Sequence, residues 1–172
     1  MAKVGLFYGS TTGNTSDDAV LIKREFEKHQ PGLVDVFDVA NEPPVKMNDY
    51  NLLIWGCSSW GAGELQDDWS GAWSKLTTLD LSGKKVALYG LGDSFGFGDT
   101  FQDALALLAE AARKQGAQLV GMWPVEGYSF DASAAVEGDH FVGLALDDDN
   151  EAAQTPQRIS AWVKQLIGEF GL

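Results

Sequence analysis

The chain has 172 residues, a hydrophobic fraction of 45% and a net charge of −13, with 25 acidic residues against 12 basic ones. This composition is enough for one well-buried domain, which we expect to span residues 1–172. The negative charge disfavours nucleic acid and anionic membrane surfaces, because both would repel the protein, and it favours a basic protein partner.

No part of the sequence has the pattern of an export signal or a membrane span. There is no run of eighteen apolar residues and no signal-peptide pattern after Met1. Cys57 is the only cysteine, and we expect it to be a buried filler at a strand end. His29 and His140 stand far apart and show no metal-binding spacing. We therefore expect a cytoplasmic protein without disulfides or bound metal.

Apolar runs alternate with helical or loop segments along the chain. This alternation predicts a parallel sheet that is covered on both faces. The expected strands are Lys3–Gly9, Leu33–Asp38, Leu52–Cys57, Lys85–Leu91 and Gln118–Trp123.

A second strand-like run, Phe141–Leu146, follows the fifth expected strand after a stretch rich in Gly, Ser and acidic residues. We interpret this as one strand split by an insertion, residues 124–140. An insertion of roughly twenty residues is longer than an ordinary connection and points to a functional or interaction loop. We expect it to form part of the surface that meets a protein partner.

Helical periodicity appears in three segments. Asp17–His29 carries apolar residues at helical spacing, as do the stretches from Phe101 to Ala112 and from Ile159 to Phe170. Gly116 is the expected C-cap of the middle helix, and Thr155 the expected N-cap of the last one, with a proline after it. Pro43 and Pro44 are expected to prevent helix before the third strand.

The stretch Gly9–Thr15 joins the first strand to the first helix and contains four hydroxyl side chains and two glycines. Amides and hydroxyls at a helix N-terminus favour an anion, most often a phosphate. The stretch matches neither the nucleotide-triphosphate loop nor the dinucleotide fingerprint, because its glycines are wrongly spaced and it has no lysine. It suits a terminal phosphate monoester, and a plain Ser/Thr-rich capping loop is the alternative.

Ligands of open parallel sheets bind outside the carboxyl ends of the strands, where the strand order reverses. The loops after the third and fourth expected strands, Cys57–Gln66 and Gly90–Asp99, each combine glycines with an aromatic residue and a carboxylate. Aromatic residues on facing loops can enclose a flat heterocycle, although each of Trp60, Phe95 and Phe97 could instead fold back onto the core.

Five motifs together resemble the flavodoxin family, of the long-chain type and including members associated with nitrogen fixation. They are Ser10–Thr15, Trp60–Leu65, Gly90–Asp93, Phe101–Ala104 and Phe141–Asp147. The resemblance implies an α/β fold: a doubly wound, five-stranded parallel sheet of order 2-1-3-4-5 with helices on both faces. Flavodoxin is itself the standard example of that strand order, with FMN at the switch point, so this architecture is carried over from the family.

The resemblance also implies which residues bind FMN. The phosphate loop contributes its hydroxyls and amides, and the two later loops contact the flavin ring. The implied cofactor-binding residues are Ser10, Thr11, Thr12, Gly13, Asn14, Thr15, Ser59, Trp60, Gly61, Gly63, Leu91, Gly92, Asp93, Phe97, Phe101, Gln102 and Asp149.

The sequence departs from the family pattern at three of these positions. Asn14 replaces a common lysine, so the phosphate has no local countercharge. Phe97 replaces a stacking tyrosine, which preserves stacking but removes a phenolic hydrogen bond. Gly61 stands where many relatives carry asparagine, at the turn whose carbonyl, by resemblance, accepts a hydrogen bond from the reduced flavin.

The implied function is that of a low-potential one-electron carrier rather than an enzyme, using the semiquinone/hydroquinone couple of FMN. Acidic residues at the flavin end would lower the potential and steer basic partners, unless they are only a solvated rim. These residues are Glu64, Asp67, Asp68, Asp93, Asp99, Asp147, Asp148 and Asp149.

The expected partners are basic redox proteins: an NADPH-flavodoxin reductase, a pyruvate-flavodoxin oxidoreductase and the nitrogenase iron protein, with the chain itself a monomer. Two alternatives share the fold. A flavin-dependent quinone or nitro reductase would need a substrate pocket and a proton donor, which these loops lack. A phosphoacceptor signalling domain would need acidic residues where this chain has Ser10–Thr12.

Overall fold

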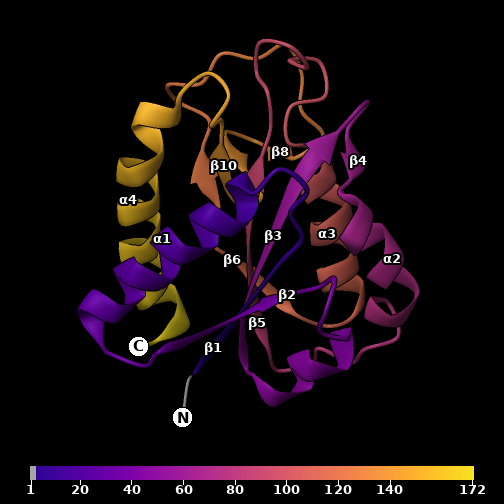
Figure 1. Cartoon of the computed structure of the whole chain (residues 1–172), viewed down its shortest axis with the longest axis vertical. Coiled ribbons are helices and arrows are strands. Elements are labelled where there is room, and N and C mark those ends of the chain that lie inside the picture. The colour runs from indigo at the N-terminus through magenta and orange to yellow at the C-terminus, as the bar shows by residue number, and fades with distance from the viewer. Residues whose placement is uncertain (1–2) are drawn as a thin grey trace.

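The computed structural model describes residues 3–172. Its centre is a twisted sheet whose main strands run parallel (Figure 1). The parallel strands are β1 (Val4–Tyr8), β2 (Val34–Asp38), β3 (Leu52–Trp60), β5 (Lys85–Leu91), β6 (Gln118–Val120) and β10 (Leu144–Leu146). The inner strands β1 and β5, together with β10, are short, buried apolar runs, as strands covered on both faces require, while β2 at the edge of the sheet carries two aspartates and is mostly half-buried.

The predicted strand order and the split fifth strand are both confirmed. The sheet runs β10-β5-β3-β1-β2, and β6 also pairs with β5. The first half of β5 pairs with β6, from Lys85 to Ala87, and its second half pairs with β10, from Tyr89 to Leu91. The two pieces of the fifth strand therefore lie end to end along one neighbour.

In the described part of the chain, four α-helices cover the sheet, two on each face (Figure 1). On one face lie α1 (Asn14–His29) and α4 (Thr155–Phe170), and on the other α2 (Asp67–Leu76) and α3 (Asp103–Lys114). Each pair of helices buries an apolar stripe against the sheet, so the molecule has two cores separated by the strands. No helix within residues 3–172 has both the length and the apolar character needed to cross a membrane.

Three local expectations need correction. A short 3-10 helix, η1 (Pro44–Asp49), begins at the proline that was expected to exclude helix, because proline suits a first helical position. Phe101 lies before α3 rather than in its stripe, although its ring is buried. Thr155 is the first residue of α4 rather than its cap, and it follows a second 3-10 helix, η2 (Ala152–Gln154).

The insertion, residues 124–140, forms structure of its own. Three two-residue strands, β7 (Trp123–Pro124), β8 (Val136–Glu137) and β9 (His140–Phe141), pair into a small antiparallel sheet. A short hairpin strand, β4 (Glu64–Leu65), pairs with the end of β3. Both features lie at the carboxyl end of the main sheet, at the top of Figure 1.

Candidate functional site

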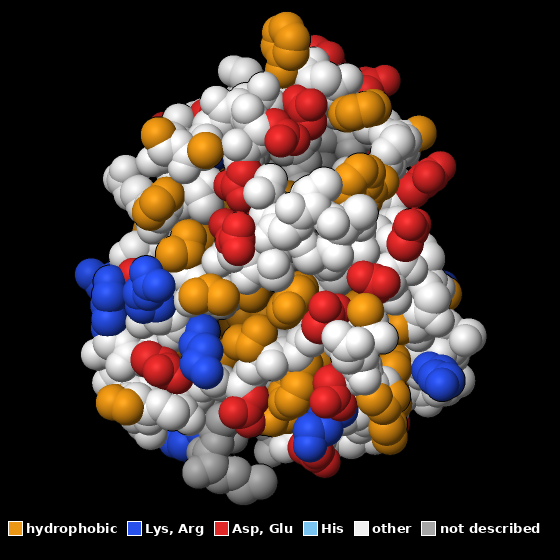
Figure 2. All heavy atoms as spheres, in the orientation of Figure 1, with side chains coloured by type: hydrophobic (Ala, Val, Ile, Leu, Met, Phe, Trp, Pro, Cys, Tyr) orange, Lys and Arg blue, Asp and Glu red, His pale blue; other side chains and the backbone are white. Residues whose placement is uncertain are grey.

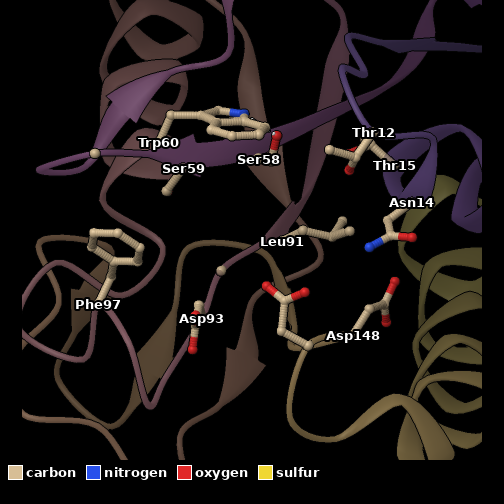
Figure 3. Close-up of a pocket in the computed structure, with 13 residues that line it drawn as sticks. Thr12, Asn14, Thr15, Ser58, Ser59, Trp60, Leu91, Asp93, Phe97 and Asp148 are labelled. Atoms are coloured by element: carbon tan, nitrogen blue, oxygen red, sulfur yellow. Dashed lines mark hydrogen bonds between the residues drawn. The ribbon is translucent and has the colours of Figure 1, made fainter.

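A cavity of about 330 Å³ lies where the loops after β1, β3, β5 and β10 meet. This is the position at which open parallel sheets bind ligands, and the size is within the range of small-molecule sites. In Figure 3 hydroxyl and amide groups lie at one end of the cavity and aromatic rings at the other. The lining residues are Thr12, Asn14, Thr15, Ser58, Ser59, Trp60, Gly61, Leu91, Gly92, Asp93, Phe97, Asp148 and Asp149.

The polar end of the cavity is the start of α1. Gly13 precedes the helix with φ 99°, and its N–H donates to Ser10 Oγ at 3.1 Å. The first amides of a helix have no acceptor within the helix, so they are free to bind an anion. The hydroxyl of Tyr89 on β5 donates to the carbonyl of Thr15 at 2.9 Å and fixes this first turn to the sheet. The resulting wall offers amide and hydroxyl donors and contains no Lys or Arg.

The rest of the loop holds its shape from outside the cavity. Thr11 is exposed, and its Oγ1 accepts a hydrogen bond from Gln66 Nε2 at 3.1 Å. Ser10, Thr11 and Gly13 do not line the cavity. The structure therefore separates the predicted phosphate loop into residues that face the cavity, Thr12, Asn14 and Thr15, and residues that shape the turn.

The aromatic end of the cavity is formed by Trp60 and Phe97. The indole N–H of Trp60 donates to Ser58 Oγ at 2.8 Å, which orients the ring. Trp60 is 39% exposed and Phe97 is 51% exposed, so neither folds back onto the core. Large apolar side chains left open beside a cavity are typical of a ligand site, because a flat ligand would cover them.

The loop after β5 is shaped by Asp93. Its Oδ1 accepts hydrogen bonds from Gly96 N at 2.7 Å, from Phe95 N at 3.1 Å and from Asn150 Nδ2 at 2.8 Å. These donors stabilise the ionised form and lower the pKa of Asp93. Asp93 thus stays charged at the cavity while it fixes the loop that carries Phe97.

The segment after β10 supplies two more carboxylates, Asp148 and Asp149. Burial raises the pKa of Asp149, and the neighbouring carboxylates of Asp93, Asp147 and Asp148 add to the effect. Asp147 itself is buried and bonded to Ser94 and to Asn150, so the expectation that it belongs to an exposed acidic rim is corrected. It joins the loop after β5 to the segment after β10.

Of the thirteen residues that line the cavity, sequence reasoning missed only Ser58 and Asp148. Ser58 neighbours the predicted Ser59, and Asp148 the predicted Asp149, so each was one residue from a predicted position. Phe101 and Gln102, which were also predicted to bind FMN, are buried and do not line the cavity. Gly63 is also off the cavity, at the end of the turn that carries Trp60.

Cys57 takes no part in the cavity. Its side chain is fully buried, and burial raises the pKa of its thiol to about 12. A protonated, inaccessible thiol is unreactive, so the expected structural role is confirmed.

Comparison with known proteins finds similarity over nearly the whole chain. A family model described as Flavodoxin matches residues 6–162. The flavodoxin of Synechococcus elongatus is 48% identical over 172 residues, which is 100% of both chains. The flavodoxin of a Nostoc species is 46% identical over 170 residues, covering 99% of this chain and 98% of the relative.

Among solved structures, the flavodoxin of Fusobacterium nucleatum bound to flavin mononucleotide superposes with a TM-score of 0.91. It is 30% identical, and the match covers 98% of this chain and 99% of that one. The similarity to flavodoxins, in sequence and in structure, thus extends over nearly the whole chain.

Proposed function

The chain belongs to the flavodoxin family, and we propose that it is a low-potential one-electron carrier whose FMN binds in the cavity between the four loops. Its relatives are electron-transfer proteins rather than enzymes, and FMN is its cofactor. The observation that carries the proposal is the division of one cavity into a donor-rich end and an aromatic end, which matches the two ends of FMN.

The residues present fit the phosphate of FMN. Thr12, Asn14 and Thr15 would hold it with hydroxyl, amide and main-chain donors at the positive end of the α1 dipole. Ser10, Thr11 and Gly13 would act on it indirectly, by fixing the loop. No lysine or arginine lines the cavity, so recognition would depend on hydrogen bonds rather than on a countercharge.

The aromatic end fits the flavin ring. Trp60 and Phe97 would cover the ring, with Leu91 as an apolar contact and with Ser59, Gly61 and Gly92 contributing main-chain surface. Bound FMN supplies one-electron redox chemistry, and the protein controls its potential by stacking, hydrogen bonding and charge. Phe97 has no hydroxyl group, so it would contribute stacking alone.

The low potential would come from the acids around the cavity. Asp93, Asp148 and Asp149 line it, and each carboxylate opposes the addition of negative charge to the ligand. A unit charge at about 10 Å in a water-like medium acts by about 0.4 kcal/mol, or roughly 20 mV for one electron. Several such charges together would lower the potential by tens of millivolts.

Partners would be basic redox proteins in the cytoplasm. The upper half of the face in Figure 2, which holds the carboxyl ends of the strands, shows acidic side chains, while the lower half shows Lys and Arg side chains mixed with further acidic ones. Such asymmetry turns the acidic end toward a basic surface during encounter. A flavodoxin reductase, a pyruvate oxidoreductase and the nitrogenase iron protein are candidate partners of this kind.

The experiment that tests the site is flavin release and rebinding. The purified protein should be yellow and should release FMN, one per chain, on denaturation; release of FAD or of no flavin would contradict the proposal.

A second experiment tests the phosphate end of the cavity. Thr12→Ala and Thr15→Ala should weaken FMN binding more than riboflavin binding, because only FMN carries the phosphate. Ser74→Ala, which removes an exposed hydroxyl on α2 away from the cavity, is the control and should change neither affinity.

A further inference from the structure

The segment Thr100–Ala104, which leads into α3, lies between the insertion and the turn that carries Trp60. It includes a residue in a left-handed conformation, Gln102 with φ 63°, which is rare outside glycine. The Gln102 side chain is fully buried and donates to the carbonyl of Leu146 at 2.9 Å. A strained, buried segment beside a functional cavity points to a positioning role.

On one side this segment supports the turn at Trp60. The N–H of Ala104 donates to Ser59 Oγ at 3.0 Å. Asp103 packs directly on the backbone of Gly63, where a Cβ added to the glycine would lie 2.5 Å from Asp103 Cβ. Gly63 is therefore required by this contact as well as by its φ of 89°.

On the other side the same segment supports the insertion. Asp103 Oδ1 accepts a hydrogen bond from Ala134 N at 2.7 Å, and Phe101 N donates to the carbonyl of Ala132 at 3.2 Å. The ring of Phe101 stacks on Phe130 at a centroid distance of 5.4 Å. The single side chain of Asp103 therefore contacts both the turn, at Gly63, and the insertion, at Ala134.

We propose that Asp103 is a positioning residue that couples the insertion to the turn carrying Trp60. Its carboxylate is anchored by the insertion through Ala134, and its Cβ defines the space into which Gly63 fits. A partner that displaces the insertion would thereby change the wall of the cavity. The coupling between the insertion and the turn does not require a bound flavin. It rests on the proposed function only in the experiment that measures the potentials of FMN.

The first test is amide hydrogen exchange in the FMN-free protein. Gly63 N–H bonds to the carbonyl of Trp60 at 3.0 Å, and Ala134 N–H bonds to Asp103, so each amide reports one end of the link. Asp103→Ala should raise exchange at both amides by about tenfold. Asp103→Asn keeps the acceptor and the size and should stay close to the parent protein. Glu110→Gln, which removes an acid from the far part of α3, should change neither amide.

A second pair of variants tests the same coupling by changing the turn instead of Asp103. These variants remain informative even if Asp103→Ala does not fold. Gly61 and Gly63 both have positive φ, so alanine strains the turn at either position, but only Gly63 touches Asp103. Gly63→Ala should raise exchange at Ala134, and Gly61→Ala should not. Equal effects of the two variants at Ala134, or no effect of either, would overturn the coupling.

The third readout uses the FMN-loaded protein. Asp103→Ala should change the separation between the two one-electron potentials of FMN, while Asp103→Asn should not. Altered exchange with unaltered potentials would overturn the role in positioning the cavity wall. If the protein bound no FMN, the proposed function would fail while the exchange data still decided the coupling.

Discussion

Gly61 and Gly63 have φ values of 52° and 89° in the turn that carries Trp60, and around Gly61 there is open space apart from Glu64 at 3.5 Å. Side chains are therefore disfavoured at Gly61 by backbone conformation rather than by crowding. A left-handed residue with a Cβ costs about 1–2 kcal/mol, which corresponds to roughly 40–90 mV for one electron.

The first prediction follows from this conformation. If the semiquinone state needs this left-handed conformation of Gly61 and the oxidised state does not, Gly61→Val should lower the first one-electron potential of bound FMN and raise the second, with a smaller effect for Gly61→Ala. Redox titration of both variants measures this. Weaker FMN binding with an unchanged separation of the two potentials would show that the glycine only makes room for the ring.

Asp18 is a buried carboxyl group on α1, close to the polar end of the cavity. Burial raises its pKa to about 9, and the carboxylates of Asp148 and Asp17 add to the effect. An unfolded Asp has a pKa of about 3.9. The stabilising contribution of the protonated Asp18 is therefore fully present below pH 4 and is lost as the pH rises through about 9.

The second prediction is that Asp18→Asn stabilises the FMN-free protein increasingly between pH 5 and pH 9. The gain in unfolding free energy at pH 9 should exceed about 1.4 kcal/mol, the equivalent of one pKa unit. Denaturant titration across this pH range is the measurement. A stability difference between Asp18→Asn and the parent protein that does not change with pH would contradict the argument.

At the scale of single residues, the sequence predicted most of the cavity because hydroxyls, glycines and aromatics cluster in loops after strands. Phe101 and Gln102 lie off the cavity, because a motif shared with a family does not distinguish residues that line a cavity from residues that support its wall. Asp147 was misassigned because a run of three acids does not reveal which one turns inward, and here Ser94 and Asn150 hold Asp147 inside.

At the scale of elements, the N-terminus of helix α3 is capped by a side chain from strand β3. Gln102, at its N-cap position, makes no side-chain capping bond, and Ser59 at the end of β3 accepts the hydrogen bond from Ala104 N instead. A helix that forms against the cavity wall in this way depends on the wall for part of its stability.

The third prediction concerns this cap. Ser59→Ala should lower the unfolding free energy of the FMN-free protein by about 1 kcal/mol, the usual cost of losing a capping hydroxyl. Denaturant unfolding measures the change. Ser74→Ala, at an exposed position within α2, should be close to neutral; a Ser59→Ala variant as stable as Ser74→Ala would mean that the contact does not act as a cap.

Most of the long elements could be predicted from the sequence, while the short ones could not. Three helices have clear apolar periodicity and the main strands are largely apolar, but the ten-residue helix α2 (Asp67–Leu76) was missed. The strands β7, β8 and β9 have two residues each, too few to show any periodicity, and they exist because the insertion folds back on Phe101. The hairpin strand β4 was missed for the same reason.

At the scale of the molecule, the charges that make up the net −13 are unevenly placed: acids lie around the cavity, while the Lys and Arg side chains on the face in Figure 2 lie toward the opposite end, among further acids. The composition gives the negative net charge, the alternation of apolar runs with helical segments predicted the parallel sheet, and the resemblance to flavodoxins implied the strand order. The distribution of charge over the surface depends on packing, since distant segments bring their acids to one end.

The fourth prediction is that electron transfer to a basic redox partner slows steeply between low and physiological salt, because ions screen the steering charges. Combined replacement of Glu64, Asp99 and Asp149 by their amides should slow transfer at low salt and flatten its salt dependence. Stopped-flow kinetics measure both effects. Glu110→Gln, away from the cavity end, is the control, and rates independent of salt would exclude a steering role.

Redox titration of the FMN-loaded protein tests the central claim most directly, because an electron carrier must separate the two one-electron steps of its flavin. We predict two resolved one-electron potentials, with the second well below that of free FMN as a result of the surrounding carboxylates. A single two-electron step at the potential of free FMN would contradict the account.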